Sequence, residues 1–196
     1  MHGAKDDGVG QADQEAAVTV EEARKEFSNG LIEGTVCPVC DRSGKLHRRQ
    51  LNERLAKILM WMDGVAGSKV SDAEGWIHMA RSAPRWITSS NQHSLLAWWG
   101  LTEPGDRSGV YRITSLGRQW VDGNVGVRRW VWSFNARPVK SDVDLSTGED
   151  NPMIKIRDCF RSADEYRSCD RVRQISKGQG LPSKQLPLEA LTVAAS

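Results

Sequence analysis

Apolar residues recur with helical spacing in one stretch of the first half of the chain. The positions, which fall at i, i+4, i+7, i+8 and i+11, are Leu51, Leu55, Ile58, Leu59 and Met62. This spacing predicts an amphipathic α-helix from residue 51 to about residue 63, with the apolar side chains on one face. The segment before the helix and its polar side are basic, through Arg48, Arg49, Arg54 and Lys57. Those charges fit either a solvated face or a track for phosphates.

Strand and helix patterns alternate further along the chain. The predicted elements are a strand at 76–79, a short helix within 81–86, a helix from about residue 89 to residue 99, strands at 101–103 and 110–114, and a helix at 115–121. Hydroxyl groups at residues 88–90 can cap the longer helix, and Gly100 supplies a left-handed stop after it. The loop at 104–109 contains the glycines and the proline that a tight hairpin needs.

This order of elements is typical of a winged helix-turn-helix. We therefore predict an α+β fold, namely a winged helix-turn-helix with an N-terminal zinc-knuckle-like turn and an added C-terminal β-hairpin. The helix at 89–99 is then the recognition helix, and the hairpin that follows is the wing. The short helix before it is interrupted by Pro84, unlike the longer positioning helix that is usual in such regulators.

The length of 196 residues fits one main domain with tails. The predicted segments are a disordered tail at 1–17, a short helix plus the cysteine knuckle at 18–49, the winged-helix domain at 50–123, a hairpin and small helix at 124–168, and a disordered tail at 169–196. Thr19 and Glu22 have the spacing of a capping box, which indicates where the first helix begins. The tails carry too little apolar surface to offset the entropy of ordering.

The predicted recognition helix offers polar side chains that can read base edges. Leu95, Leu96 and Trp99 are expected to face the core, which leaves Gln92 and His93 outward. Asn and Gln can pair with adenine in the major groove. The helix has no Lys or Arg, so phosphate contacts must come from arginines before it and on the wing. The predicted DNA-binding residues are Arg85, Ser89, Ser90, Asn91, Gln92, His93, Arg107 and Arg112.

Positive charge is concentrated in the central part of the chain, although the net charge is only +2. Residues 1–40 carry 3 Lys and Arg against 8 Asp and Glu, residues 41–140 carry 16 against 8, and residues 141–196 carry 8 against 9. A basic domain favours anionic partners, because neutralising phosphates releases counterions. The surplus is also compatible with an ordinary solvated surface.

Cys37-Pro38-Val39-Cys40 is the motif with the most definite chemistry. Two thiolates at this spacing can reach one tetrahedral zinc ion, and they form half of a zinc knuckle. The predicted structural zinc ligands are Cys37, Cys40, His47 and His78, of which His47 is nearest in sequence. A reduced pair of packed thiols and a redox couple remain as alternatives. Cys159 and Cys169 have no metal spacing and are expected to be packed free thiols.

Eight tryptophans stand against two tyrosines and three phenylalanines. Core filling is the simpler explanation, and a stacking platform for single-stranded nucleic acid is the other. The residues whose position predicts burial are Trp61, Trp76, Trp98, Trp99 and Trp120. Residues 127–134 alternate as a strand that places Trp130, Trp132 and Phe134 on one face. This aromatic face is either a lid on the core or an exposed docking surface.

The sequence also resembles known proteins at short motifs. WWGLTEP, a polar tip and VYRITSLGRQWVDG resemble the wing and following helix of MarR- and PadR-like winged-helix regulators. CPVC, LN, WIHM, SNQ, WWGL and a later Asn-containing hairpin resemble a group of small, uncharacterised phage and bacterial proteins, over about residues 37–166. The resemblance implies a compact winged-helix domain with a cysteine knuckle in front of it, and no known activity.

The function that these features predict is binding of double-stranded DNA by a phage or bacterial transcriptional regulator. The alternative is a non-enzymatic protein-interaction factor that uses the same scaffold, such as a phage protein that binds a host protein. Nucleotide-binding, metalloprotease and hydrolase motifs are absent from the sequence, so an enzyme is not expected. No apolar run suits a membrane span and no signal peptide is recognised, so we expect a cytoplasmic protein, in the host cytoplasm if phage-encoded. Either terminus could supply a helix for a homodimer.

Overall fold

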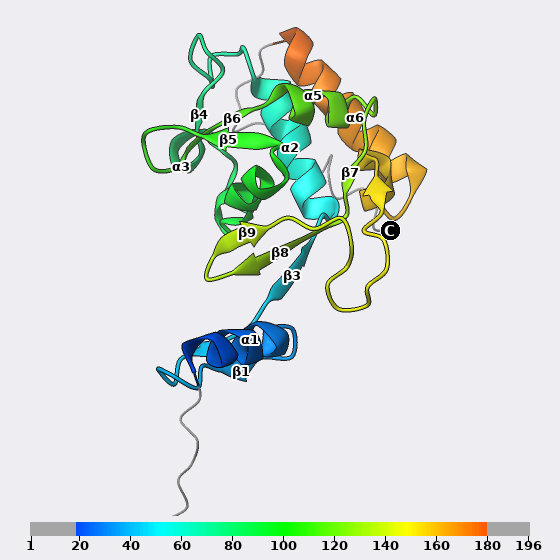
Figure 1. Ribbon diagram of the computed structural model, residues 1–196. Coiled ribbons are helices and arrows are strands. Elements are labelled where there is room, and N and C mark those ends of the chain that lie inside the picture. The colour runs from blue at the N-terminus through cyan, green and yellow to red at the C-terminus, as the bar shows by residue number, and fades with distance from the viewer. Residues whose placement is uncertain (1–18, 180–196) are drawn as a thin grey trace, which may run out of the picture. The chain divides into compact units, whose positions relative to one another are not determined.

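The computed structural model describes residues 19–179, which form an α+β fold (Figure 1). The chain divides into two compact units, Met1–Leu46 and His47–Ser196. The described elements of the first unit are α1 (Val20–Gly30), β1 (Thr35–Val36) and β2 (Ser43–Gly44). The predicted tail at 1–17 and the part of the second predicted tail beyond residue 179 lie outside the described residues.

The first unit is a helix packed on a two-stranded hairpin. The capping box predicted at Thr19 and Glu22 is present, with each side chain bonded to the other residue's backbone N–H. β1 and β2 pair antiparallel, and their connecting loop carries the CPVC motif. Gly44 lies so close to the rings and methyl groups of Phe27 and Leu31 that a Cβ atom would have no room there. This packing anchors the hairpin to the helix.

The second unit contains the remaining elements. Its first half consists of β3 (His47–Gln50), α2 (Glu53–Val65), β4 (Ile77–His78), α3 (Met79–Ser82), α4 (Arg85–Thr88), the 3₁₀ helix η1 (Gln92–Trp99), β5 (Thr102–Pro104) and β6 (Val110–Ile113). Its second half consists of α5 (Ser115–Val121), β7 (Val127–Arg128), β8 (Trp130–Phe134), β9 (Arg137–Val139), β10 (Met153–Ile154), the 3₁₀ helix η2 (Ile156–Cys159) and α6 (Ala163–Gln179).

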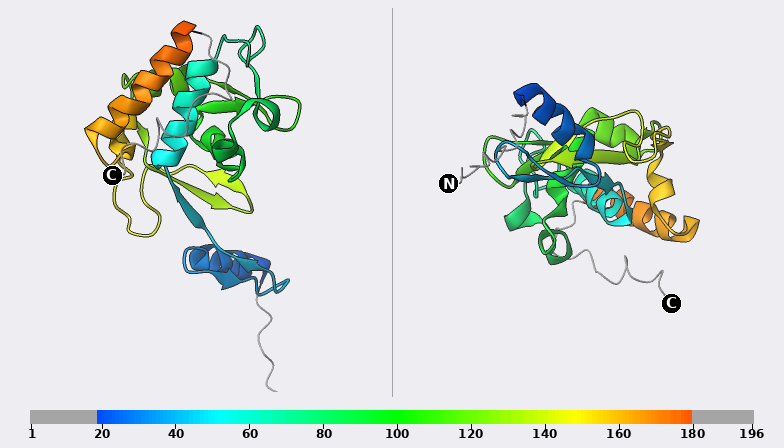
Figure 2. Two further views of the ribbon diagram at one scale, coloured as in Figure 1. Left: turned by 180° about the vertical axis from the view of Figure 1, so that it is seen from behind. Right: turned by 60° about the horizontal axis from the view of Figure 1, so that its bottom comes forward.

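Helix α2 is the centre of this unit. The Asn52 side chain caps it by accepting a hydrogen bond from the Leu55 backbone N–H, at 3.1 Å. Ten of its thirteen residues are buried, so it is covered on more sides than its one-faced apolar pattern predicts. The additional cover comes from α6, which lies along α2 in two views (Figures 1 and 2).

The C-terminal helix corrects two predictions. A small helix was expected to end by residue 168, followed by a disordered tail from residue 169, whereas α6 begins at Ala163 and continues to Gln179. Cys169, Arg173 and Ser176 are buried on one side of it. Small and polar side chains at these positions give no apolar periodicity, which is why the sequence pattern did not indicate the helix.

A cluster of buried ion pairs holds α6 to α2. Arg173, 5% exposed, pairs with Asp63, 2% exposed, at 3.4 Å, and with Asp122 at the end of α5 at 3.1 Å. The Lys177 ammonium lies 2.6 Å from the same Asp63 carboxylate. Opposite charges at this depth stabilise each other only while both partners are present.

Three strands in the order β4-β6-β5 form the sheet beside α2. The chain passes through α3, α4 and η1 between β4 and β5, and then returns along β6, where Ile77 is paired with Tyr111 and Thr102 with Ile113. The strands predicted at 76–79, 101–103 and 110–114 are thus confirmed within a residue or two.

Thr114 and Gly117 join this sheet to α5. The Thr114 hydroxyl caps α5 by accepting from the Gly117 backbone N–H at 3.0 Å, and it donates to the Gly100 carbonyl at 2.7 Å. A Cβ on Gly117 would fall inside contact distance of the Leu101 carbonyl oxygen. The T-x-x-G sequence therefore serves a cap and a close backbone approach.

The predicted strand at 127–134 is split in two. β7 pairs with β10, whereas β8 lies between β3 and β9. Asn151 is fully buried at the break, where its amide bonds both the N–H and the C=O of Trp130. The β8–β9 turn uses Asn135 and Ala136 at positive φ, 48° and 58°, as a two-residue hairpin requires.

Trp132 is buried, but it lies outside the main core cluster, which Val131 on the opposite face of β8 joins, so the lid interpretation stays a prediction. Trp130 is half-buried, with the Arg48 and Arg129 guanidinium carbons each 4.6 Å from its ring. Of the other tryptophans, Trp61, Trp99 and Trp120 are buried as predicted, and Trp98 is partly buried against the core.

We predict that Asp63→Ala lowers the free energy of unfolding by about 1–3 kcal/mol, because it removes the buried carboxylate that Arg173 and Lys177 share, while Asp122 and Asp170 still pair with Arg173. Urea denaturation followed by tryptophan fluorescence measures the change. Asp164→Ala removes an exposed partner of Arg167 on the same helix and should cost less than about 1 kcal/mol. Equal losses in the two variants would contradict this account of α6.

Gly117→Ala should destabilise the second unit by about 1–3 kcal/mol, because the new methyl group meets backbone that has no room to move. Ser115→Ala, at an exposed position two residues earlier, is the matched control and should change stability by about 0.5 kcal/mol or less. Thermal unfolding of both variants tests this, and a neutral Gly117→Ala would show that α5 does not approach Leu101 closely.

Candidate nucleic-acid interface

The predicted recognition helix at 89–99 corresponds to the 3₁₀ helix η1, and the short helix α4 precedes it. α4 ends at Thr88, η1 begins at Gln92, and Asn91 between them has a left-handed conformation with φ of 52°. The hydroxyls of Thr88, Ser89 and Ser90, which were expected to cap this helix, each donate instead to the backbone carbonyl three residues earlier. Because asparagine tolerates the left-handed region, the chain bends there, and the predicted helix begins at Gln92 instead of near residue 89 and has 3₁₀ geometry.

His93 is buried, with 6% of its surface exposed, so the prediction that it faces outward is wrong. Its ring meets that of Tyr111 on β6 edge to face, with centroids 5.2 Å apart. Burial lowers the pKa of His93, which keeps the ring neutral against the sheet. Gln92 is also half-buried. Ser89 and Asn91 are the exposed polar residues of the predicted base-reading set.

Arg112 is engaged within the protein. Its guanidinium pairs with Glu103 of β5 and stacks on Trp76, 4.4 Å from the ring centroid. The hydrogen bond to Glu103 raises the pKa of Arg112, and the charges of Glu74 and Asp72 act in the same direction. This side chain links the two strands of the hairpin, and the phosphate contact predicted for it stays a prediction.

Three of the exposed arginines that have no ion-pair or hydrogen-bond partner among residues 19–179 lie in or beside the predicted recognition segment and the wing. They are Arg81 on α3, Arg85 on α4 and Arg107 in the β5–β6 loop. The backbone N–H of Met79 donates to the Gly109 carbonyl at 2.9 Å, so the start of α3 touches the end of that loop. The three cations therefore occupy consecutive or contacting segments. Arg81 was not among the predicted residues, although its place four residues before Arg85 could have indicated it.

Arg54 adds a fourth cation to this region. Its guanidinium donates to the Trp86 carbonyl at 2.5 Å and lies 3.4 Å from the Ser89 hydroxyl, which places it at the C-terminal end of α4. Exposed carbonyl groups at a helix end favour a cation there. The sequence did not decide whether Arg54 belongs to a solvated face or to a phosphate track. In the structure its guanidinium is hydrogen-bonded to the segment at the predicted recognition helix.

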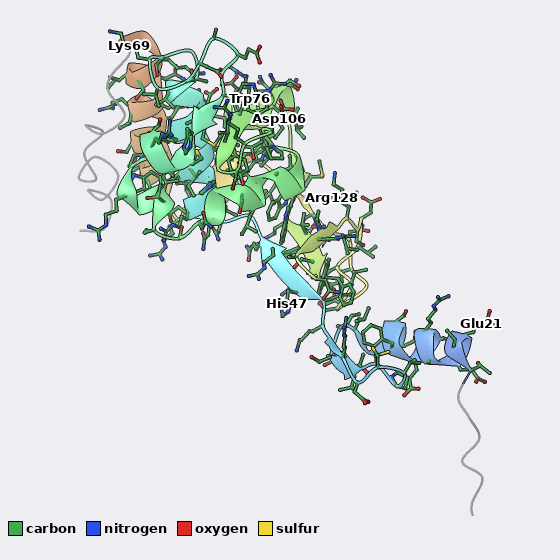
Figure 3. The ribbon with its side chains drawn as sticks, turned by 90° about the vertical axis from the view of Figure 1, so that its left-hand side faces the viewer. Glu21, His47, Lys69, Trp76, Asp106 and Arg128 are labelled. Atoms are coloured by element: carbon green, nitrogen blue, oxygen red, sulfur yellow. The ribbon has the colours of Figure 1, made fainter. Side chains whose placement is uncertain are left out.

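The opposite side of the β5–β6 loop is mixed in charge. A groove of about 780 Å³ separates the loop from residues 69–76, and Trp76 and Asp106 both line it (Figure 3). Its charged lining residues are Lys69, Asp72, Glu74, Asp106 and Arg107. Asp72 is already used, because its carboxylate accepts from the backbone N–H groups of residues 74 and 76. This groove lacks the positive charge that a phosphate track needs.

A second groove of about 380 Å³ is lined by aromatic and aliphatic side chains. Trp98, Trp99 and Trp130 form much of it, together with Leu116 and Met153. The Trp99 indole donates to the Arg128 carbonyl at 2.8 Å, which fixes one wall. The rim carries Lys140 and an ion pair of 2.7 Å between Arg128 and Asp142. Sequence reasoning missed this groove, because its residues come from five separate segments.

The CPVC turn lies within the first unit. The backbone N–H groups of Val39 and Cys40 point at the Cys37 sulfur and, in that order, lower the pKa of the Cys37 thiol. The Cys37 carbonyl accepts from Asp41 N–H at 3.0 Å, and Asp41 has a left-handed φ of 56°. The turn therefore holds the Cys37 thiol in an environment that favours its thiolate.

The four predicted zinc ligands belong to different units. Cys37 and Cys40 lie in the first unit, whereas His47 and His78 lie on β3 and β4 of the second. Within residues 19–179, no group of three or more His, Cys, Asp or Glu side chains gathers at metal-binding distance. Of the four predicted ligands, the two thiols therefore lie together in one loop, and the two histidines lie in the other unit.

The other two cysteines have no sign of reactivity. Burial raises the pKa of the Cys159 thiol to about 12 and that of the Cys169 thiol to about 11. Both pack against the core of the second unit. The prediction of packed free thiols is confirmed.

Comparison of the chain with protein-family models, with curated proteins and with solved structures gives no match. Among the described residues, no helix is both long enough and apolar enough to cross a membrane.

Proposed function

We propose that this chain is a winged-helix protein that binds double-stranded DNA and regulates transcription. The supporting architecture is the order α2, β4, α3, the α4–η1 segment and the β5–β6 hairpin, with β4 paired to β6. The observation that carries the proposal is the set of unpartnered cations on α3, on α4 and in the β5–β6 loop, which is the wing of such a fold. Arg81, Arg85 and Arg107 contact phosphates, and Arg54 adds charge beside α4.

Affinity in this proposal comes mainly from the backbone of the duplex. Cations that are already paired have little to gain from a phosphate, whereas exposed and unpaired ones release counterions when they bind. The short α4 and the bend at Asn91 present few side chains to base edges, with Ser89 and Asn91 in the best position. We therefore expect modest sequence preference on a strong electrostatic background.

Replacing Arg81, Arg85 and Arg107 together by alanine should weaken binding to every duplex. If each arginine neutralises one phosphate, the slope of log K against log salt becomes shallower by about 0.9 per arginine removed. Fluorescence anisotropy with a labelled duplex at several salt concentrations measures this slope.

Arg171→Ala is the matched control, because Arg171 is an exposed arginine on α6. It should leave both affinity and slope unchanged. Absence of binding at low salt, or equal effects of the control and the triple variant, would reject the proposal.

A second candidate function, a protein-interaction factor, is favoured by the tryptophan-lined groove at Trp98 and Trp130. Grooves that combine aromatic walls with a few polar rim groups suit protein partners. A complex that survives nuclease treatment and is lost on Trp98→Ala, with the DNA affinity unchanged, would support this candidate.

For the first unit we propose structural zinc binding by the CPVC turn. The support is the fit of the turn to the metal: the two thiols share one loop, backbone N–H groups point at a sulfur, and Asp41 takes the left-handed position that closes the turn. When bound, the ion would hold the loop between β1 and β2.

A further inference from the structure

The CPVC turn supplies two zinc ligands, and the described part of its unit supplies no third. Residues 19–46 contain no histidine and no cysteine other than Cys37 and Cys40. Their carboxylates do not gather around the thiols either. Structural zinc sites are closed by four ligands in tetrahedral geometry. A zinc ion bound to this turn therefore needs two ligands from outside residues 19–46.

Exposed apolar side chains surround the thiols. Val36, before Cys37, is 57% exposed, and Val39, between the two cysteines, is 64% exposed. Pro38 and Cys40 are also exposed. Exposed valines and an exposed proline beside the thiols contribute no stability to a loop that remains in water, whereas covering them with similar side chains removes apolar surface from water.

The charge of the unit permits a close approach of a second copy. Residues 19–46 carry four Lys and Arg and five Asp and Glu, so two such units repel each other only weakly. Arg42 follows the turn directly, and Lys45 lies just beyond β2, where its ammonium donates to the Glu33 carbonyl at 3.1 Å. These cations can compensate the net charge of −2 that four thiolates and one Zn²⁺ carry together.

We propose that the knuckle closes a zinc site between two copies of this chain, with Cys37 and Cys40 of each copy as the four ligands. A two-fold axis through the ion makes the contact self-complementary, so that one surface serves both partners. Each thiol loses its proton on binding, and the valines of the two turns cover each other around the metal. The inference rests on the proposed zinc binding and is independent of DNA binding.

The test uses the full-length protein without a tag, in a reductant that does not bind metal. Elemental analysis should give about one zinc ion per two chains, because four ligands come from two copies. Sedimentation equilibrium should give twice the chain mass of 21.8 kDa. Chelation should halve the mass, and added zinc should restore it. Combined Cys37→Ser and Cys40→Ser should give a metal-free monomer.

Two further variants separate the bridge from a site within one chain. His47→Ala should change neither zinc content nor mass, since the bridge does not use His47. Val39→Glu keeps both thiols but buries a charge in the contact, so it should weaken dimerisation about tenfold or more. Val20→Glu, at a valine of similar exposure on α1, should leave it unchanged.

One zinc ion per chain in a monomer would overturn the bridge, and loss of that zinc in His47→Ala would assign the site to a single chain. A dimer that persists after chelation would also overturn it. Protein without zinc would remove the zinc proposal itself. None of these outcomes alters the salt-slope test of DNA binding, so the two proposals fail separately.

Discussion

The burial of most of α2 is the constraint on which the second unit depends. The sheet, η1 and α5 cover one part of its surface, and α6 covers the rest. Because Asp63 is among the buried residues, α6 must bring a cation with it, and Arg173 does so. Arg173 also holds Asp122 at the end of α5. The helix that closes the core is thus linked to the helix that follows the β5–β6 hairpin.

The arginines of this unit fall into two groups with different consequences. Arg48, Arg112 and Arg173 have carboxylate partners and hold segments of the fold together. Arg81, Arg85 and Arg107 have no such partner among the described residues and remain in solvent. Counting charge along the sequence cannot separate these groups, because the partners lie in other segments. The proposed DNA contact depends on the second group, to which Arg54 adds charge beside α4.

Sequence reasoning succeeded where local chemistry decides the structure. The capping box at Thr19, the hairpin glycines and the helix at 115–121 each depend on a few neighbouring residues, and the structure has them where they were predicted. It failed where distant contacts decide. Helical periodicity places His93 on the outward face, yet the 3₁₀ geometry of η1 and the ring of Tyr111 place it inside.

The same limit applies to the sites. The pairing of β3 with β8 and the tryptophan-lined groove bring together residues that are far apart in sequence, which no short pattern reveals. The CPVC motif is clear from the sequence. The other two zinc ligands are not, because spacing along the chain does not show whether they are histidines of the second unit or cysteines of a second copy.

The central claim is that α3, α4 and the β5–β6 loop face the DNA. The most direct measurement is a titration of isotope-labelled protein with a short duplex at low salt, followed by NMR of backbone amides and indole N–H groups. The account predicts that the largest changes fall at Arg81, Arg85, Ser89 and Arg107, with the Trp98 indole unaffected. Changes confined to the groove around Trp98 and Trp130, or no changes at all, would contradict it.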